Sequence, residues 1–321
     1  MQIFDSLVGN LMVPTILFFV LGLVAAVVRS DLSIPEGAAK FMSIYLLLAI
    51  GFKGGHSLAD NGLNTEVFAA LCAGLLLSFA IPFIAYGLLR SMTRLNALNA
   101  AAVAGHYGSI SIVTFVAASS LLQLTGVTSD GYMVAVAATM EVPAILSALW
   151  IAHRFGQQGS TGRVPMRDLF ANGSIVLLAG AFLIGALTQD RGMQMIAPFV
   201  VTPFTGILCL FLLDMGLTAG RSLLRNRHLL SAGLFAFGLL MPVIGAVLAM
   251  GVGTVIGLQT GSLFLLMVLS ASASYIAVPA AMKIALPQAE AGIYLTLSLG
   301  VTFPFNIILG LPLYLWLAEL V

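Results

Sequence analysis

Two stretches of this sequence are long enough to cross a lipid bilayer and yet polar at their centres. They are NALNAAAVAGHYGSISIVTFVAASSLLQL, residues 96–124, and GSLFLLMVLSASASYIAVPAAMKIAL, residues 261–286. A membrane-spanning helix needs about 20 mostly apolar residues. Small and hydroxylic residues at mid-depth, followed by Pro279 in the second stretch, are typical of an interrupted helix, because its freed backbone groups must find partners inside the protein. The two stretches therefore predict two broken spans that meet at the bilayer midplane.

The rest of the chain indicates an all-α polytopic membrane protein. Of its 321 residues, 60% are hydrophobic and only 8% are charged, against roughly 25% charged in an average soluble domain. Ten apolar runs of this kind leave no room for a soluble catalytic domain, and a net charge of +1 without a basic tract excludes a nucleic-acid surface. The runs are at about 10–28, 41–57, 66–89, 98–123, 131–152, 172–188, 198–219, 229–256, 261–285 and 292–318.

The two halves of the chain resemble each other. Glycines, serines and a proline of the first half recur in the same order in the second half, at a nearly constant separation along the chain. The matches are Gly51 with Gly216, Gly55 with Gly220, Ser109 with Ser272, Ser111 with Ser274, and Pro143 with Pro304. Such a series predicts a duplication, and five spans per copy place the second copy upside down in the membrane. We therefore expect two inverted repeats, residues 1–152 and 169–321, with broken helices 4 and 9, joined by a cytoplasmic linker of residues 153–168.

The basic residues predict the orientation. If the spans alternate, 11 of the 13 lysines and arginines lie on one side, which the positive-inside rule makes cytoplasmic. Both termini then face outward, and the first run is a retained helix, because MQIFD lacks the basic region of a cleaved signal. The exceptions are Arg191 and Lys53, and we expect Lys53 to reach the outer interface.

The two breaks indicate an anion site. Half-helices starting near Ser109 and Ser272 would point two N-termini at the membrane centre, each equivalent to roughly +0.5 charge. The hydroxyls of these serines and of Ser111 and Ser274 can add donors. A small monovalent anion fits such a site. The alternative is that the glycines and serines only let helices pack closely.

Four other polar residues lie at membrane depth. Glu141 is interpreted as part of a cation or proton site, because a carboxylate there is costly unless it is paired or functional. Asp214 and Asn306 are further cation candidates, with Asn306 as a cap of the Pro304 kink as the alternative. His106 is either a proton-sensitive gate or a hydrogen-bond donor to loose carbonyls of the first half-helix. Neither a metal site nor a bound cofactor is expected.

Three segments carry a resemblance to a known family: AGHYGSISIVTFVAAS (104–119), DGYMVAVAATMEVPAIL (130–146) and SASASYIAVPAAM (270–282). In type and order they resemble the SbtA-type sodium-dependent bicarbonate transporter family. The resemblance implies a ten-helix sodium/bicarbonate symporter with core and gate subdomains, a homotrimer in a bacterial plasma membrane, regulated by a PII-like protein on the cytoplasmic face. The segment between the halves is shorter here than in better-known members, which leaves that partner open. The family's anion site falls on Tyr107, Gly108, Ser109, Ser111, Ser272 and Ser274.

The sequence thus predicts a transporter and not an enzyme. Moving a monovalent anion inward against a negative-inside potential costs about 2.3 kcal/mol per 100 mV, and one co-transported sodium ion cancels that term. We expect sodium-coupled uptake of bicarbonate by alternating access. The alternatives are proton-coupled transport of another small oxyanion or carboxylate through Glu141 and His106, a passive channel and, remotely, an intramembrane serine hydrolase using His106 and Ser109.

Overall fold

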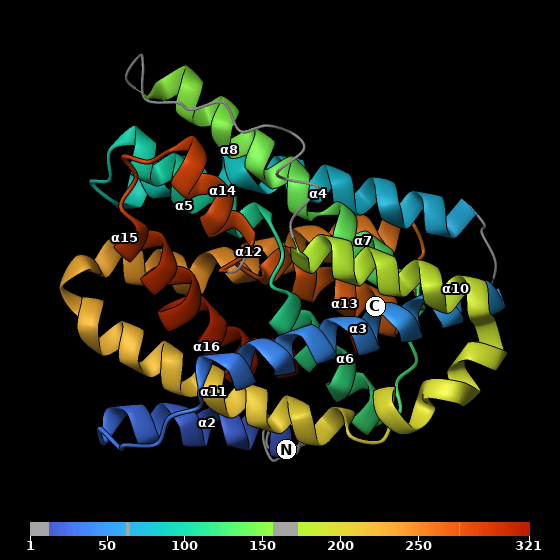
Figure 1. The fold of residues 1–321 in the computed structure, drawn as a ribbon. Helices are drawn as coiled ribbons and strands as arrows, with labels where there is room; N and C mark the ends of the chain where they lie inside the picture. The colour runs from blue at the N-terminus through green and yellow to red at the C-terminus, as the bar shows by residue number, and fades with distance from the viewer. Residues whose placement is uncertain (1–12, 62–64, 157–172, 276) are drawn as a thin grey trace.

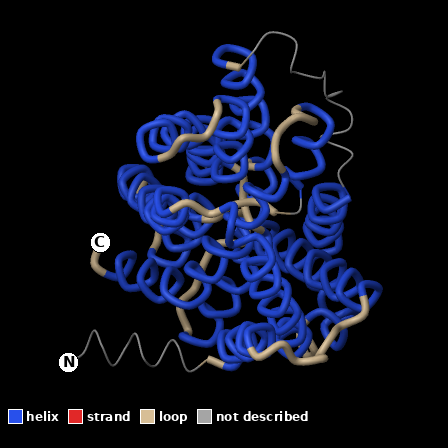
Figure 2. Tube along the Cα trace, turned by 90° about the vertical axis from the view of Figure 1, so that its left-hand side faces the viewer, coloured by secondary structure: helices blue, strands red, loops and turns tan. Residues whose placement is uncertain are grey.

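A computed structural model describes residues 13–61, 65–156, 173–275 and 277–321 of the chain. In these residues every regular element is a helix, as Figure 1 and the tube of Figure 2 show. The expected linker, residues 153–168, lies mostly outside the described residues. The helices are α2 (Pro14–Val27), α3 (Glu36–Asn61), α4 (Thr65–Met92), α5 (Ala97–Gly108), α6 (Ile112–Thr125), α7 (Met133–Thr139), α8 (Glu141–Phe155), α10 (Gly173–Val200), α11 (Phe204–Asn226), η1 (Arg227–Leu229), α12 (Ala232–Val255), α13 (Thr260–Ala271), α14 (Ala277–Ala285), α15 (Ala291–Leu295), η2 (Thr296–Thr302), α16 (Phe303–Phe305), η3 (Asn306–Gly310) and α17 (Leu311–Glu319).

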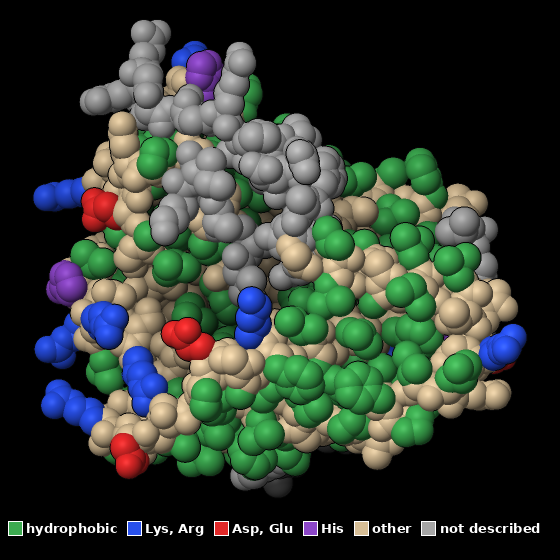
Figure 3. All heavy atoms as spheres, in the orientation of Figure 1, with side chains coloured by type: hydrophobic (Ala, Val, Ile, Leu, Met, Phe, Trp, Pro, Cys, Tyr) green, Lys and Arg blue, Asp and Glu red, His purple; other side chains and the backbone are tan. Residues whose placement is uncertain are grey.

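Seven helical segments of the described chain are long and apolar enough to cross a membrane, and α2 and α13 are shorter apolar helices. Large apolar side chains are exposed on the outside of the helices, among them Phe68, Leu187 and Val255. In Figure 3 hydrophobic side chains cover much of the visible face, while most of the visible lysines and arginines gather at its left-hand edge. A soluble protein avoids an apolar exterior of this kind. The chain is therefore a multi-pass membrane protein.

Two pairs of helices pack through glycines at which the backbones touch. Gly51 lies against the Leu178 carbonyl of α10, where a Cβ would come within 2.7 Å of the oxygen. Gly216 on α11, the residue that matches Gly51 in the second half, lies in the same way against the Phe19 carbonyl of α2. Small residues let helices approach closely in membranes. The repeated glycines thus make equivalent contacts, with α3 against α10 and α11 against α2.

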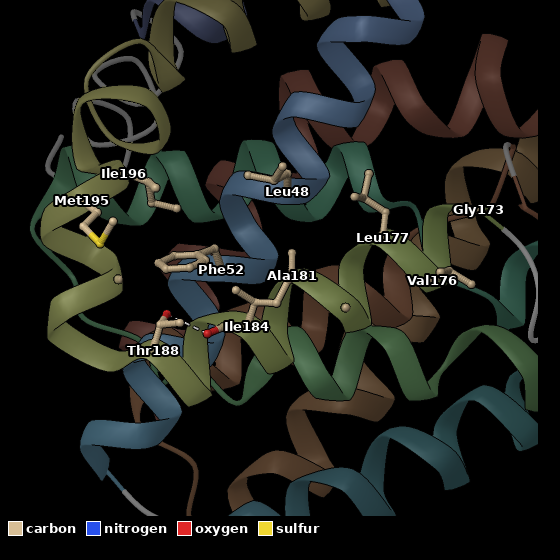
Figure 4. A pocket seen from close by; sticks show the side chains of 12 residues that line it. Leu48, Phe52, Gly173, Val176, Leu177, Ala181, Ile184, Thr188, Met195 and Ile196 are labelled. Carbon is tan, nitrogen blue, oxygen red and sulfur yellow. Dashed lines mark hydrogen bonds between the residues drawn. The ribbon is translucent and has the colours of Figure 1, made fainter.

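The α10 helix bends at Gln189, whose φ of 48° and ψ of −143° interrupt it. Its two arms and α3 enclose a groove of about 570 Å³, drawn in Figure 4. The side chains that line this groove are nearly all apolar, for example Leu48, Phe52 and Met195. Thr188 is the polar exception, but its hydroxyl donates to the Ile184 carbonyl. The groove thus has the surface of a lipid-facing cleft and lacks the chemistry of an ion site.

The remaining helices surround the two interrupted stretches. The α5 helix packs against α4 and α8, and α13 packs against α12 and α6. Nearly every residue of α5 and α13 is buried, including polar Asn99, His106, Ser262 and Ser270. The interrupted helices are thus enclosed by other helices, and the pairs α3–α10 and α2–α11 contact each other through α3 and α11. In Figure 1, α2 and α11 run along the bottom of the view and α10 lies at its right.

Candidate functional site

Both predicted interruptions are present. The α5 helix ends at Gly108, residues 109–111 are not helical, and α6 begins at Ile112. The α13 helix ends at Ala271, and α14 begins at Ala277. Ser109 and Ser272, the first residues after α5 and α13, have almost the same extended backbone, with φ of −93° and −88° and ψ of 163° at both. The two halves of the chain therefore break their helices in the same way.

The two breaks contact each other directly. The Ser111 amide donates to Ser272 Oγ at 2.8 Å, and the Ser274 amide donates to the His106 carbonyl at 2.7 Å. Ser272 Oγ in turn donates to the Leu269 carbonyl of α13 at 2.8 Å. These residues are buried, so the two bonds between the breaks give partners to the Ser111 and Ser274 amides, which water cannot reach. The expectation that the two broken spans meet is confirmed by these contacts.

The half-helices begin later than the sequence predicts, and this changes which donors are available. Ser109 and Ser272 follow the first half-helices, whereas α6 starts three residues after Ser109. The Ser111 and Ser274 amides are used in the contacts between the breaks, and Ser111 Oγ caps the Thr114 amide. The first amides of α6, those of Ile112 and Val113, have no acceptor among the described residues. These two amides are helix-terminal donors that an anion can use.

Several buried polar side-chain atoms in the described chain have no hydrogen-bond partner. Leaving such an atom unpaired costs about 1–3 kcal/mol, so native proteins rarely do so unless a ligand or water completes the site. Most of the residues concerned lie in or beside the broken spans. The atoms are His106 Nε2, Ser109 Oγ, Ser270 Oγ and Tyr275 Oη, which belong to the two interrupted stretches, and Glu141 Oε2 and Thr296 Oγ1, which belong to other helices. The two interrupted stretches thus hold four of these six atoms, and these atoms remain free to bind a polar ligand.

Tyr107 and Gly108 have structural contacts. The Tyr107 hydroxyl lies 2.5 Å from Thr302 Oγ1, and it must be the donor because Thr302 donates its own hydrogen to the Gly238 carbonyl at 2.7 Å. A Cβ at Gly108 would overlap the ring of Pro82 in α4, so close packing there requires glycine. The structure therefore leaves only the backbone of these two residues for an anion.

His106 is hydrogen-bonded to a carbonyl inside its own helix, one turn before it, and not to a carbonyl at the open end of α5. Its Nδ1 donates to the Ala102 carbonyl at 2.7 Å, and its ring stacks on Tyr294 with 4.4 Å between centroids. Because Nδ1 carries the hydrogen, Nε2 of the neutral ring is an acceptor. No hydrogen bond joins His106 to Ser109 in the described chain, so the nucleophile–base pair of a serine hydrolase is not formed.

The three cation candidates differ in their surroundings. Glu141 is the first residue of α8 and is 3% exposed, with no partner for Oε2. Asn306 donates to the Ala271 carbonyl at the end of α13 and accepts from Tyr314, so both ends of its amide are occupied. Asp214 on α11 is half-buried and has no hydrogen bond to another described residue. Of the three, Glu141 has a buried oxygen free to bind a cation.

A polar pocket beside α6 was not foreseen from the sequence. Its volume is about 210 Å³, and its lining includes Ser119 and Gln123 of α6, Lys53 of α3 and Asp130. The Lys53 ammonium lies 4.3 Å from the centre of the Phe204 ring, and no described carboxylate is within ion-pair distance of it. The sequence feature that could have predicted this pocket is the four-residue spacing of Ser119 and Gln123, which places them on one helix face.

The fold and this centre define the class of protein: a multi-pass membrane transporter whose two broken helices face each other inside the bundle. A comparison with curated proteins gives no significant match. Residues 14–319 match the Na+-dependent bicarbonate transporter superfamily, which is nearly the whole chain, and the protein belongs to that family. It is accordingly a transporter and not an enzyme.

Proposed function

We propose that the protein is a sodium-coupled symporter that takes up bicarbonate by alternating access. Family membership supports the substrate and the coupling ion. The observation that carries the proposal is the pair of facing breaks, with free amides at Ile112 and Val113 and an unpartnered hydroxyl at Ser109. Such donors hold one negative charge at the start of a helix.

The hydrogen-bond acceptor His106 Nε2, in the first broken span, supports binding of bicarbonate in preference to carbonate. Bicarbonate has oxygens that accept hydrogen bonds and one O–H group that donates. Ser109 and the α6 amides supply donors, and His106 Nε2 supplies a buried acceptor. Carbonate has no hydrogen to give that nitrogen, so its binding would leave a buried acceptor unpaired. Tyr107, Gly108, Ser111, Ser272 and Ser274 shape the site through the contacts described above.

The ten spans and the inverted duplication are part of the proposal, and one repeated contact supports them. The Asp130 amide donates to Ser262 Oγ at 3.0 Å, and that hydroxyl donates to the Asp130 carboxylate at 2.7 Å. The Glu290 amide donates to the Asn99 side chain at 2.8 Å, and the Asn99 amide group donates to the Glu290 carboxylate at 3.3 Å. In each case a helix of one half holds the residue that starts the last span of the other half. A duplicated chain with crossed halves produces such a pair.

Alternating access requires two bodies that move against each other. We propose that the α3–α10 and α2–α11 pairs form the gate and that the broken helices with α4, α8 and α12 form the moving core. The pocket with Lys53 lies between α3 and α6, where the two bodies meet, and provides the outer entrance. The cytoplasmic side is then the one rich in lysine and arginine, and both termini face outward.

The assembly and location proposed here follow the family resemblance. We propose a homotrimer in a bacterial plasma membrane, with sodium as the coupling ion and no other cofactor. A PII-like regulatory protein would dock on the cytoplasmic face, the side on which we place the linker of residues 153–168.

The test is uptake of radiolabelled bicarbonate by proteoliposomes that contain the purified protein. An inward sodium gradient should drive accumulation, and replacing sodium by choline should abolish it. If uptake persists in choline and follows a pH step, proton coupling through Glu141 and His106 replaces the sodium proposal. Flux that neither saturates nor depends on a cation would indicate a channel.

A further inference from the structure

We propose that Glu141 and Ser270 together bind the coupling cation, at a position where the other half of the molecule has a tyrosine–threonine hydrogen bond instead. The inference deepens the proposed sodium-coupled transport by naming the residues that hold the cation. It rests on a comparison of two helix pairs that begin from the same kind of contact.

In the first pair, α5 and the helix that follows Glu290, side chains are hydrogen-bonded at two levels. Asn99 near the start of α5 is hydrogen-bonded to Glu290, the residue before α15. Eight residues further along α5 is Tyr107, and twelve residues after Glu290 is Thr302, and their hydroxyls are hydrogen-bonded. A helix rises about 1.5 Å per residue, so the second contact lies about 12 Å deeper than the first.

The second pair starts in the same way. Ser262 near the start of α13 is hydrogen-bonded to Asp130, shortly before α7, and α7 and α13 are in contact. Eight residues further along α13 is Ser270, and eleven residues after Asp130 is Glu141. Ser270 therefore occupies the place of Tyr107, and Glu141 the place of Thr302. The sequence alignment of the halves agrees, because the register that matches the serines of the two breaks also pairs Tyr107 with Ser270, and the register that matches the two prolines pairs Glu141 with Thr302.

What differs is the side chain that fills the space between the helices. Where α5 has a tyrosine, α13 has a serine, which lacks the phenol ring that reaches across to the opposite helix. Ser270 and Glu141 are both polar and buried, and each has 3% of its surface exposed. Ser270 Oγ and Glu141 Oε2 both lack a hydrogen-bond partner among the described residues. A buried carboxylate oxygen without a partner is costly, and a cation bound between Glu141 and Ser270 explains why this one is tolerated.

The chemistry of these groups selects a monovalent hard cation. Carboxylate and hydroxyl oxygens suit such ions. One carboxylate balances one positive charge. In the part of the chain that the structure describes, no group of three His, Cys, Asp or Glu side chains could hold a transition metal or calcium. A sodium ion fits this set of ligands.

The test measures sodium binding directly, on purified protein in detergent without bicarbonate. Thermal unfolding is followed at increasing sodium chloride, with choline chloride keeping the ionic strength constant. Wild-type protein should be stabilised by sodium, because a ligand that binds only the folded state raises its melting temperature. Ser270→Ala should raise the half-effective sodium concentration about tenfold or more, and Glu141→Gln should abolish the effect.

Two further variants keep the inference falsifiable. Ser270→Tyr restores the ring found in the other half and should abolish the sodium effect while raising the sodium-free melting temperature. Thr296→Ala removes another buried, unpartnered hydroxyl and should keep the wild-type sodium response. Wild-type sodium dependence in both Ser270 variants would overturn the inference, as would a wild-type protein stabilised equally by sodium and choline. This test measures sodium binding and not transport. A failure of bicarbonate uptake in proteoliposomes would therefore refute the proposed function without refuting the sodium site.

Discussion

Removing the Ser109 hydroxyl should weaken anion binding without weakening the fold. The hydroxyl is fully buried and has no partner in the described chain. Ser109→Ala therefore breaks no internal hydrogen bond, and it removes an unsatisfied polar group whose burial costs about 1–3 kcal/mol. In the absence of the anion, the free energy of unfolding should stay constant or rise. A hydrogen bond to a charged group contributes about 1.5–3 kcal/mol, so the apparent bicarbonate affinity should fall roughly 10- to 150-fold.

The matched variant is Ser272→Ala, at the equivalent position of the other break. Ser272 Oγ accepts from the Ser111 amide and donates to the Leu269 carbonyl. Its removal leaves a buried amide without an acceptor, and the free energy of unfolding should fall by about 1–3 kcal/mol.

The assay combines the KM for bicarbonate in proteoliposomes with unfolding of the detergent-purified protein. The reasoning is refuted if Ser109→Ala destabilises the protein as much as Ser272→Ala and leaves the KM unchanged.

Three further predictions concern packing, capping and entry. Gly55→Ala should lower the melting temperature by several degrees, because a Cβ there overlaps the α10 backbone, whereas Gly206→Ala, with no atom within 4 Å of the new Cβ, should not. Asn306→Ala should reduce the free energy of unfolding by about 1–3 kcal/mol, measured by denaturation, because it leaves the last carbonyl of α13 unpaired. Lys53→Gln should slow bicarbonate uptake at low ionic strength, and added salt should narrow the difference from wild type, since a long-range attraction is screened; equal rates at all salt concentrations would exclude an entrance role.

The interruptions were predictable because their cause is local. Glycine, serine and proline at mid-membrane depth lower the cost of ending a helix, and they do so wherever the chain folds. Which serine would cap the second half-helix was not predictable, because either serine of Ser109–Ile110–Ser111 can act as an N-cap. The structure places that role on Ser111, whose Oγ accepts from the Thr114 amide. The sequence prediction of a half-helix starting near Ser109 was therefore wrong by about three residues.

The residues that sequence reasoning overlooked are those whose role depends on the opposite half of the chain. Ser270 is one of three similar serines in SASAS, and nothing local distinguishes it. Its importance follows from the Tyr107–Thr302 bond, which joins residues 195 positions apart. Asn306 could equally be interpreted as a cation ligand or a cap until its bond to α13 was seen.

The sequence by itself determined that this is a multi-pass helical membrane protein of the bicarbonate transporter type, with two interrupted helices at particular places. Hydropathy and backbone breaking are properties of short segments, and they survive any arrangement of the helices. Only the tertiary structure decided which donors at the breaks are free and which are hydrogen-bonded to acceptors of the opposite break. A serine amide is available to an anion only if no carbonyl or hydroxyl from the distant half of the chain reaches it first, and that depends on how the two halves pack.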